Sequence, residues 1–150
     1  MKVIKDVPWA GTIDDPSNVK KWQPELSFAV TPCCDYENAD FDGSHHVMSV
    51  LAFHQPSKTL HIDDTFTYFN APKKFPLNLL PIKTDDVLFN FNLKKILRNS
   101  KTPNAMLVYR DWYRNEVLNK WDIENAVFAH DGVLLGGGMA RFERLMNFFE

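Results

Sequence analysis

Two neighbouring stretches in the first half of the chain have the hydrophobic pattern of β-strands. Residues 46–53 are almost wholly apolar, as in a strand buried on both faces. Residues 59–66 alternate apolar and polar positions, and the turn-forming residues 55–58 separate the two stretches. Because so short a turn joins strands that run in opposite directions, we predict an antiparallel pair. A further strand is predicted over residues 25–31, where it stops at Pro32.

Helical patterns dominate the second half of the chain. One helix is predicted over residues 85–98, and a second begins at the capping pair Thr102 and Pro103 and runs to about residue 120. Residues 125–129 form a short apolar strand that ends at His130. The glycine run at 136–138 could cradle a phosphate, but without the lysine and spacing of a P-loop a turn is the better interpretation. A final helix follows, with one apolar stripe that comprises Met139, Phe142, Leu145, Met146 and Phe149.

Strands that alternate with helices toward the end of the chain predict an α/β class, with α+β as the alternative. The length of 150 residues favours a single domain over residues 1–150, and residues 1–24, rich in polar residues and proline, predict an irregular arm. We expect the last helix and the helix that begins at Pro103 to cover one face of the sheet.

Composition and charge exclude several classes of partner. The net charge is −2 with both signs spread along the chain, which excludes the basic surface typical of nucleic-acid and membrane binding. The sequence has no run of about 18 apolar residues and no signal-peptide pattern at its start. Cys33 and Cys34 are adjacent, and neighbours in sequence rarely form a disulfide. Two reduced thiols therefore predict a cytoplasmic protein.

Polar residues stand at unexpected places in the two strands near residue 60. If the second strand is regular, Asp64 lies on the same face as Leu60, Ile62 and Phe66. An unpaired carboxylate on such a face is costly, so a metal ion or a hydrogen-bonding cluster would have to satisfy it. The alternative is that Asp64 lies past the strand end and caps the next turn. His130 ends an apolar strand, at the position where sites of α/β proteins are built, although a structural role is the alternative.

Three further polar residues have competing interpretations. His54 precedes a turn-forming pair, so it is interpreted as a turn histidine rather than a metal ligand. His61 and Asp63 lie two positions apart on one strand face, where they could bind a metal or share a proton. A solvent-exposed strand face is the more common account of such a pair.

Two motifs resemble a known superfamily. The run HHVMSVLAFHQPSKTLHIDDTF is similar to the segment of the metallo-β-lactamase superfamily with a histidine, a strand, "KTL" and "GDTLF". This alignment places Asp64 on the motif's aspartate, Asp63 where the family has glycine, and His45 or His46 near its histidine. The run WDIENAVFAHDG resembles the later strand and its "GHG"-like turn, which places His130 on the last histidine. The likeness covers roughly residues 10–150, is specific only around 45–66 and 121–138, and is closer to a little-characterised β-lactamase-like branch.

The resemblance implies half of an αββα sandwich, with mostly antiparallel strands covered by helices. It implies a divalent metal, with zinc the first choice and iron or manganese as alternatives, held by His45 or His46, Asp64 and His130. Asp64 and His130 would be the catalytic residues. A metal-activated water would attack an ester, thioester, amide or phosphodiester of an unidentified small molecule.

The superfamily's HxHxDH motif is absent from the sequence. We therefore expect either the carboxyl-terminal half of a longer protein or a branch without that motif, and catalysis by this chain would be incomplete and the metal itself could be absent. The alternative is a non-catalytic α/β binding domain of the same ancestry, in which these residues form a hydrogen-bonded cluster. In either case the uncovered sheet face predicts a homodimer, a missing amino-terminal half, or an apolar patch.

Overall fold

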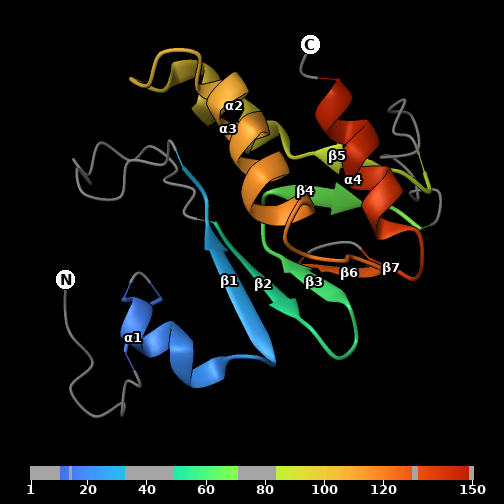
Figure 1. The fold of residues 1–150 in the computed structure, drawn as a ribbon. Coiled ribbons are helices and arrows are strands. Elements are labelled where there is room, and N and C mark those ends of the chain that lie inside the picture. The colour runs from blue at the N-terminus through green and yellow to red at the C-terminus, as the bar shows by residue number, and fades with distance from the viewer. Residues whose placement is uncertain (1–10, 14, 33–48, 71–83, 130–131, 149–150) are drawn as a thin grey trace, which may run out of the picture.

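The strands form two sheets, and helices lie on one side of the larger sheet (Figure 1). The computed structural model describes residues 11–13, 15–32, 49–70, 84–129 and 132–148. The larger sheet has the order β1 (Leu26–Val30), β2 (Val50–His54), β3 (Thr59–Ile62), β6 (Asn125–Phe128) and β7 (Val133–Leu134). The smaller sheet pairs β4 (Phe66–Tyr68) with β5 (Val87–Phe89).

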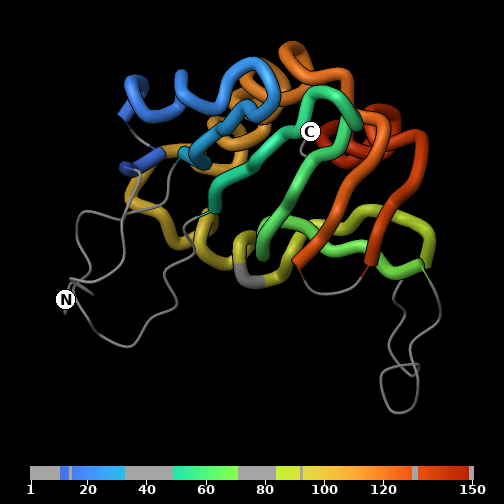
Figure 2. Tube along the Cα trace, turned by 90° about the horizontal axis from the view of Figure 1, so that it is seen from below, coloured from blue at the N-terminus to red at the C-terminus, as the bar shows by residue number. Residues whose placement is uncertain are grey.

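The main helices are α2 (Phe91–Asn99), α3 (Ala105–Trp112), its continuation as the π-helix η3 (Tyr113–Leu118), and α4 (Gly138–Asn147). Near the amino terminus lie α1 (Pro16–Val19) and the 3₁₀ turn η1 (Lys20–Trp22). Figure 2 shows the sheet from below, with α3 and α4 behind it. This arrangement confirms the α/β class and the prediction that the two later helices cover one face. None of the helices in the described ranges combines the length and apolar character needed to cross a bilayer.

The strand pairing confirms the predicted hairpin. β2 and β3 are antiparallel, with Phe53 opposite Leu60, and the turn between them lies at residues 55–58. β1 adds to β2 in the antiparallel sense. β6 pairs with β3 in parallel, with Ile62 opposite Phe128, and β7 returns antiparallel along β6. The larger sheet is therefore mostly antiparallel, with one parallel pair at its centre.

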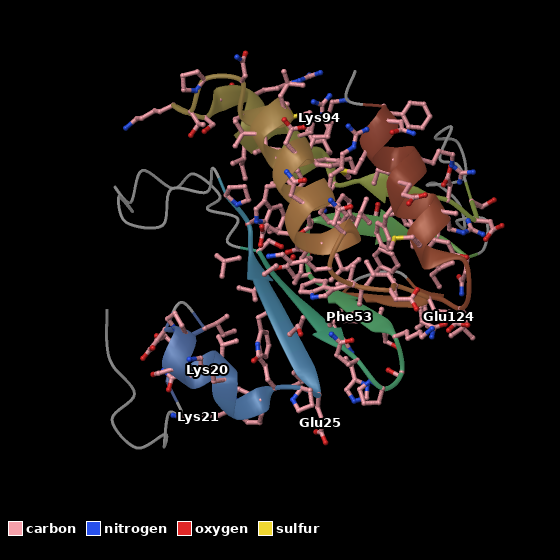
Figure 3. All side chains as sticks on the ribbon, in the orientation of Figure 1. Lys20, Lys21, Glu25, Phe53, Lys94 and Glu124 are labelled. Carbon is pink, nitrogen blue, oxygen red and sulfur yellow. The ribbon has the colours of Figure 1, made fainter. Side chains whose placement is uncertain are left out.

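Alternate strand residues are buried against the helices, as the period of two requires. In β2, Leu51 and Phe53 are fully buried, whereas their neighbours are half-buried. Phe53, labelled in Figure 3, stacks on Trp121 with ring centroids 5.4 Å apart. Phe66 packs edge-on against Tyr113 at 5.2 Å and also contacts Phe142 of α4. These rings form the core between the sheets and the helices.

Two predicted elements are wrong in their boundaries. The strand predicted over residues 59–66 is two strands, because β3 ends at Ile62 and β4 begins at Phe66 in the other sheet. The helix predicted over residues 85–98 begins only at Phe91, because Val87–Phe89 pairs with β4 as strand β5. Asp85 has a positive φ of 59°, which a helix does not accommodate. Pairing with a distant strand has overridden the local helical pattern.

The predicted cap at Thr102 is also wrong, because α3 begins at Ala105 with Asn104 in the left-handed conformation and no side-chain cap. The arm predicted as irregular contains α1, which begins at the cap Asp15, whose carboxylate accepts a hydrogen bond from the Ser17 amide at 2.8 Å. Lys20 and Lys21, on the short turn that follows, are exposed (Figure 3).

The glycine run before α4 is a tight turn against the chain before β6. The amides of Gly138 and Met139 donate to the carbonyls of Glu124 (3.0 Å) and Ile123 (2.8 Å). A Cβ at position 138 would lie 3.0 Å from the Glu124 carbonyl, so only glycine fits without a shift. Because these two amides are already bonded, the turn interpretation holds and the phosphate interpretation is wrong for them.

Candidate functional site

One end of the larger sheet carries Asp63 and Asp64, two of the polar residues that the sequence singled out, directly after β3. β3 and β6 are parallel neighbours, so their carboxyl ends lie side by side, and the amide of Ala129 donates to the carbonyl of Ile62 at 3.0 Å. β2 runs the opposite way and begins at this same end, where β1 finishes. Residues just outside four strands therefore meet there, although they are far apart in sequence.

Four side chains form a polar cluster at this end: Thr31, Ser49, Asp63 and Thr65. The Ser49 hydroxyl donates to Asp63 Oδ1 at 2.5 Å, and the Thr65 hydroxyl donates to the same oxygen at 2.8 Å. The hydroxyls of Ser49 and Thr65 also contact each other. Thr31 donates from its hydroxyl to the Ser49 carbonyl at 3.0 Å and from its amide at 3.1 Å.

The cluster is buried and its members bond one another. Thr31, Ser49 and Thr65 are buried, with exposed fractions of 3 %, 1 % and 0 %. Buried hydroxyls persist in a protein when their hydrogen bonds are made inside it. The Asp63 carboxylate is half-buried and accepts both hydroxyls. The cluster thus holds the turn that connects β3 to β4.

Asp64 lies in that turn and is exposed. It does not share a strand face with Leu60, Ile62 and Phe66, because β3 ends at Ile62. The interpretation of Asp64 as a residue past the strand end is therefore correct for its backbone. Its role as a metal ligand stays a prediction.

The other predicted ligands, His45, His46 and His130, lie outside the described residues. Whether they meet Asp64 is therefore not tested, and neither is the predicted hydrogen bond between Asp64 and His130. Within the described ranges, no three His, Cys, Asp or Glu side chains are grouped so that they could hold a metal ion. The described part of the site contributes Asp64 and the polar cluster.

The remaining histidines of the hairpin have simple roles. His54 is the last residue of β2 rather than a turn residue, and its Nδ1 forms a hydrogen bond with the Ser57 hydroxyl of the turn at 2.7 Å. His61 is exposed and lies opposite Ala52. Asp63 does not lie on the solvent-exposed strand face that carries His61, because the Asp63 carboxylate accepts hydrogen bonds from the buried hydroxyls of Ser49 and Thr65. The interpretation of a solvent-exposed strand face is therefore wrong for Asp63.

A second polar group, the Asp85 cluster, joins the smaller sheet to α4. Its members are Asp85, Tyr68 and Arg141. The Tyr68 hydroxyl donates to Asp85 Oδ1 at 2.8 Å, and Arg141 donates to the same oxygen at 3.1 Å and to the Asp85 carbonyl. The Arg141 guanidinium also lies 5.9 Å from the Tyr68 ring centroid.

The hydrogen bonds of this cluster change two pKa values. The bond from Tyr68, and then those from Arg141, lower the pKa of Asp85 below its ordinary value. The same bond to Asp85, and then burial, raise the pKa of Tyr68. Sequence reasoning missed this group because Tyr68 ends β4 and Asp85 lies just before β5, two strands that only the fold pairs.

The polar cluster was also missed, although a weak signal existed. Thr31, Ser49 and Thr65 each stand within one or two positions of a strand end. Nothing in their local spacing shows that these strand ends meet.

The chain matches no protein-family model, no curated protein and no solved structure. The resemblance to the metallo-β-lactamase superfamily therefore rests on the two sequence motifs alone.

Proposed function

We propose that the chain is a metal-dependent hydrolase-like domain of the metallo-β-lactamase kind, with its site at the sheet end where β3 and β6 finish. The observation that carries the proposal is the parallel register of these strands, with Ile62 opposite Phe128. The described parts of the two motifs that resemble the superfamily lie side by side at this end, where the Ala129 amide donates to the Ile62 carbonyl at 3.0 Å. An unrelated arrangement of the same strands would have separated them.

The described residues do not by themselves fit a metal ion. Asp64 offers one exposed carboxylate, and Asp63 is committed to Ser49 and Thr65. A zinc site takes about four ligands, so the histidines outside the described ranges would have to supply the rest. When bound, such an ion would lower the pKa of a water molecule and make it a nucleophile for an ester, thioester, amide or phosphodiester.

The chain's own contribution at this end is positioning. The buried hydroxyls of Ser49 and Thr65 hold the Asp63 carboxylate, and this fixes the backbone of the turn that carries Asp64. Ligands held by supporting hydrogen bonds keep their geometry when an ion or substrate binds. The proposal includes a small-molecule substrate, a cytoplasmic location, and a homodimer or an amino-terminal half that completes the site.

The test is metal binding by the full chain purified without chelator. We expect elemental analysis to find a divalent metal, and calorimetric titration with Zn²⁺ or Mn²⁺ to show a saturable site. Asp64→Asn should weaken that site by about 100-fold, because an essential carboxylate ligand is lost. Asp122→Asn is the matched control, an exposed carboxylate remote from this end. Absence of saturable binding, or equal effects of both substitutions, would overturn the proposal.

The second candidate is a non-catalytic binding domain of the same ancestry. The observation in its favour is that the polar cluster satisfies its own hydrogen bonds without an ion. It predicts a protein free of metal that keeps its fold when chelators are present. Sedimentation then separates the proposed assemblies, since a homodimer would have twice the mass of the chain.

A further inference from the structure

A pocket between the smaller sheet and the helices has a lining of mostly apolar and basic residues. It lies between β5, α2, α3 and the end of α4, and has a volume of about 360 Å³. That volume is within the range of small-molecule sites, roughly 300–1,000 Å³. Its floor is apolar and includes Leu88, Phe89 and Met106. Phe148 stands at its rim with 73 % of its surface exposed.

Three cations line this pocket: Lys94, Arg98 and Arg144. One carboxylate, Asp86, faces them, and it forms a salt bridge with Arg144 at 2.6 Å. The described residues of the lining therefore carry an excess of two positive charges, although the chain as a whole has a net charge of −2. The charge of the pocket is opposite to that of the protein.

Lys94 and Arg98 carry this excess. They lie four positions apart on α2, so they share one face of the helix, and Lys94 is labelled in Figure 3. Like charges at this spacing repel each other and destabilise a helix. Within the described ranges the two side chains make no salt bridge or hydrogen bond that would offset the repulsion.

The sequence around α2 has no acidic residue that could compensate the charges of Lys94 and Arg98. Residues 87–110 contain five Lys and Arg residues and no Asp or Glu. An anion from solution is the partner that would bond both Lys94 and Arg98, and the apolar floor beside them would bury an uncharged body. Arg144, held in place by Asp86, adds a third donor to the lining.

We propose that this pocket binds a small amphiphilic anion, a carboxylate or a phosphate monoester carried on an aromatic or short alkyl body. The charged group would be bound by Lys94 and Arg98, and the body would pack on Leu88, Met106 and Phe148. The pocket is independent of the sheet end where we place the metal, since the two have no residue in common.

The test is calorimetric titration of the full chain with 1-naphthyl phosphate. The double variant Lys94→Gln with Arg98→Gln should weaken binding by about tenfold or more, because two charge-assisted hydrogen bonds are lost. The matched control is Lys95→Gln with Lys101→Gln, which removes the same charge from exposed residues that do not line the pocket. The control should keep its affinity within about twofold.

Three further measurements identify the ligand class. Inorganic phosphate should bind much more weakly than 1-naphthyl phosphate. Phe148→Ala should reduce this difference in affinity, because the apolar body of 1-naphthyl phosphate then loses its contact at the rim. Titration with 1-naphthoate separates a carboxylate preference from a phosphate preference. The proposal is overturned if 1-naphthyl phosphate shows no saturable binding, or if both double variants weaken it equally, which would indicate attraction to net charge alone.

Discussion

The two ends of the larger sheet use the same kinds of polar residue in opposite ways. At the end where β3 and β6 finish, hydroxyls and one carboxylate form the buried polar cluster. At the other end, the turn between β2 and β3 also carries hydroxyl groups and charges, but they are exposed. There the Ser57 hydroxyl donates to Thr59 Oγ1 at 2.8 Å, and Lys58 forms a salt bridge with Asp122 at 2.7 Å.

The difference shows that burial, and not the number of hydrogen bonds, gives a polar group its energetic weight. Water replaces a lost partner at the exposed turn, so a substitution there costs little. In the buried cluster a lost partner leaves a hydroxyl or a carboxylate without a hydrogen bond, and the full desolvation cost appears. The buried polar groups at the end where we place the site therefore contribute more to the specificity of the fold than the exposed groups of the turn.

The largest expected effect is at the buried cluster. Ser49→Ala removes a hydroxyl that donates to Asp63 and contacts Thr65, and we expect the free energy of unfolding to fall by about 2 kcal/mol. Ser57→Ala, the same change at the exposed turn, should cost less than about 0.5 kcal/mol. Urea unfolding followed by circular dichroism measures both. Equal losses at the two ends would refute the comparison.

The Tyr113 hydroxyl is a buried group at which we expect a substitution to stabilise the fold. Tyr113 is fully buried in η3, its hydroxyl has no hydrogen bond within the described ranges, and burial raises its pKa well above the usual value. Tyr113→Phe keeps the ring contacts with Phe66 and removes the unsatisfied group. We expect the free energy of unfolding to rise by about 1 kcal/mol. A loss of stability in the same urea titration would show that the hydroxyl is satisfied.

The Asp85 cluster should affect stability less than the buried polar cluster and more than the exposed turn, because its hydrogen bonds involve charged groups that are accessible to water. The pKa of Asp85 is lower in the folded chain than its ordinary value of 3.8, so the carboxylate stabilises the fold above that value. This contribution is lost as the pH falls below about 4, toward the lowered pKa. The difference in unfolding free energy between the native chain and Asp85→Asn should therefore shrink on acidification from pH 7 to pH 3. A constant difference would contradict the prediction.

The smallest effect is expected at the salt bridge of the exposed turn. The side chains of Lys58 and Asp122 are 48 % and 76 % exposed, and such pairs contribute little to stability. The hydrogen bond to Asp122 raises the pKa of Lys58, but solvent screens the interaction. We expect Asp122→Asn to leave the midpoint of urea unfolding unchanged at low and at high salt. A clear decrease that vanishes in salt would show that this end is also stabilised electrostatically.

The sequence by itself determined the elements whose pattern is local. The hairpin of β2 and β3 follows from two strand-like stretches and a turn too short for any other connection. The strand β6 and the helix α4 follow from apolar periodicity on either side of the glycine turn. Each of these inferences needed only residues within about one element of each other.

The tertiary structure alone decided how distant segments pair. It ended β3 at Ile62, turned residues 87–89 into strand β5, and placed β6 parallel to β3. It also brought Thr31, Ser49 and Thr65 together with Asp63, and Lys94 and Arg144 to the lining of one pocket. Local periodicity records which face of an element is apolar, but it does not record which element will cover that face or continue its hydrogen bonds. The buried polar groups depend on that second choice, so the polar cluster and the pocket emerged only from the fold.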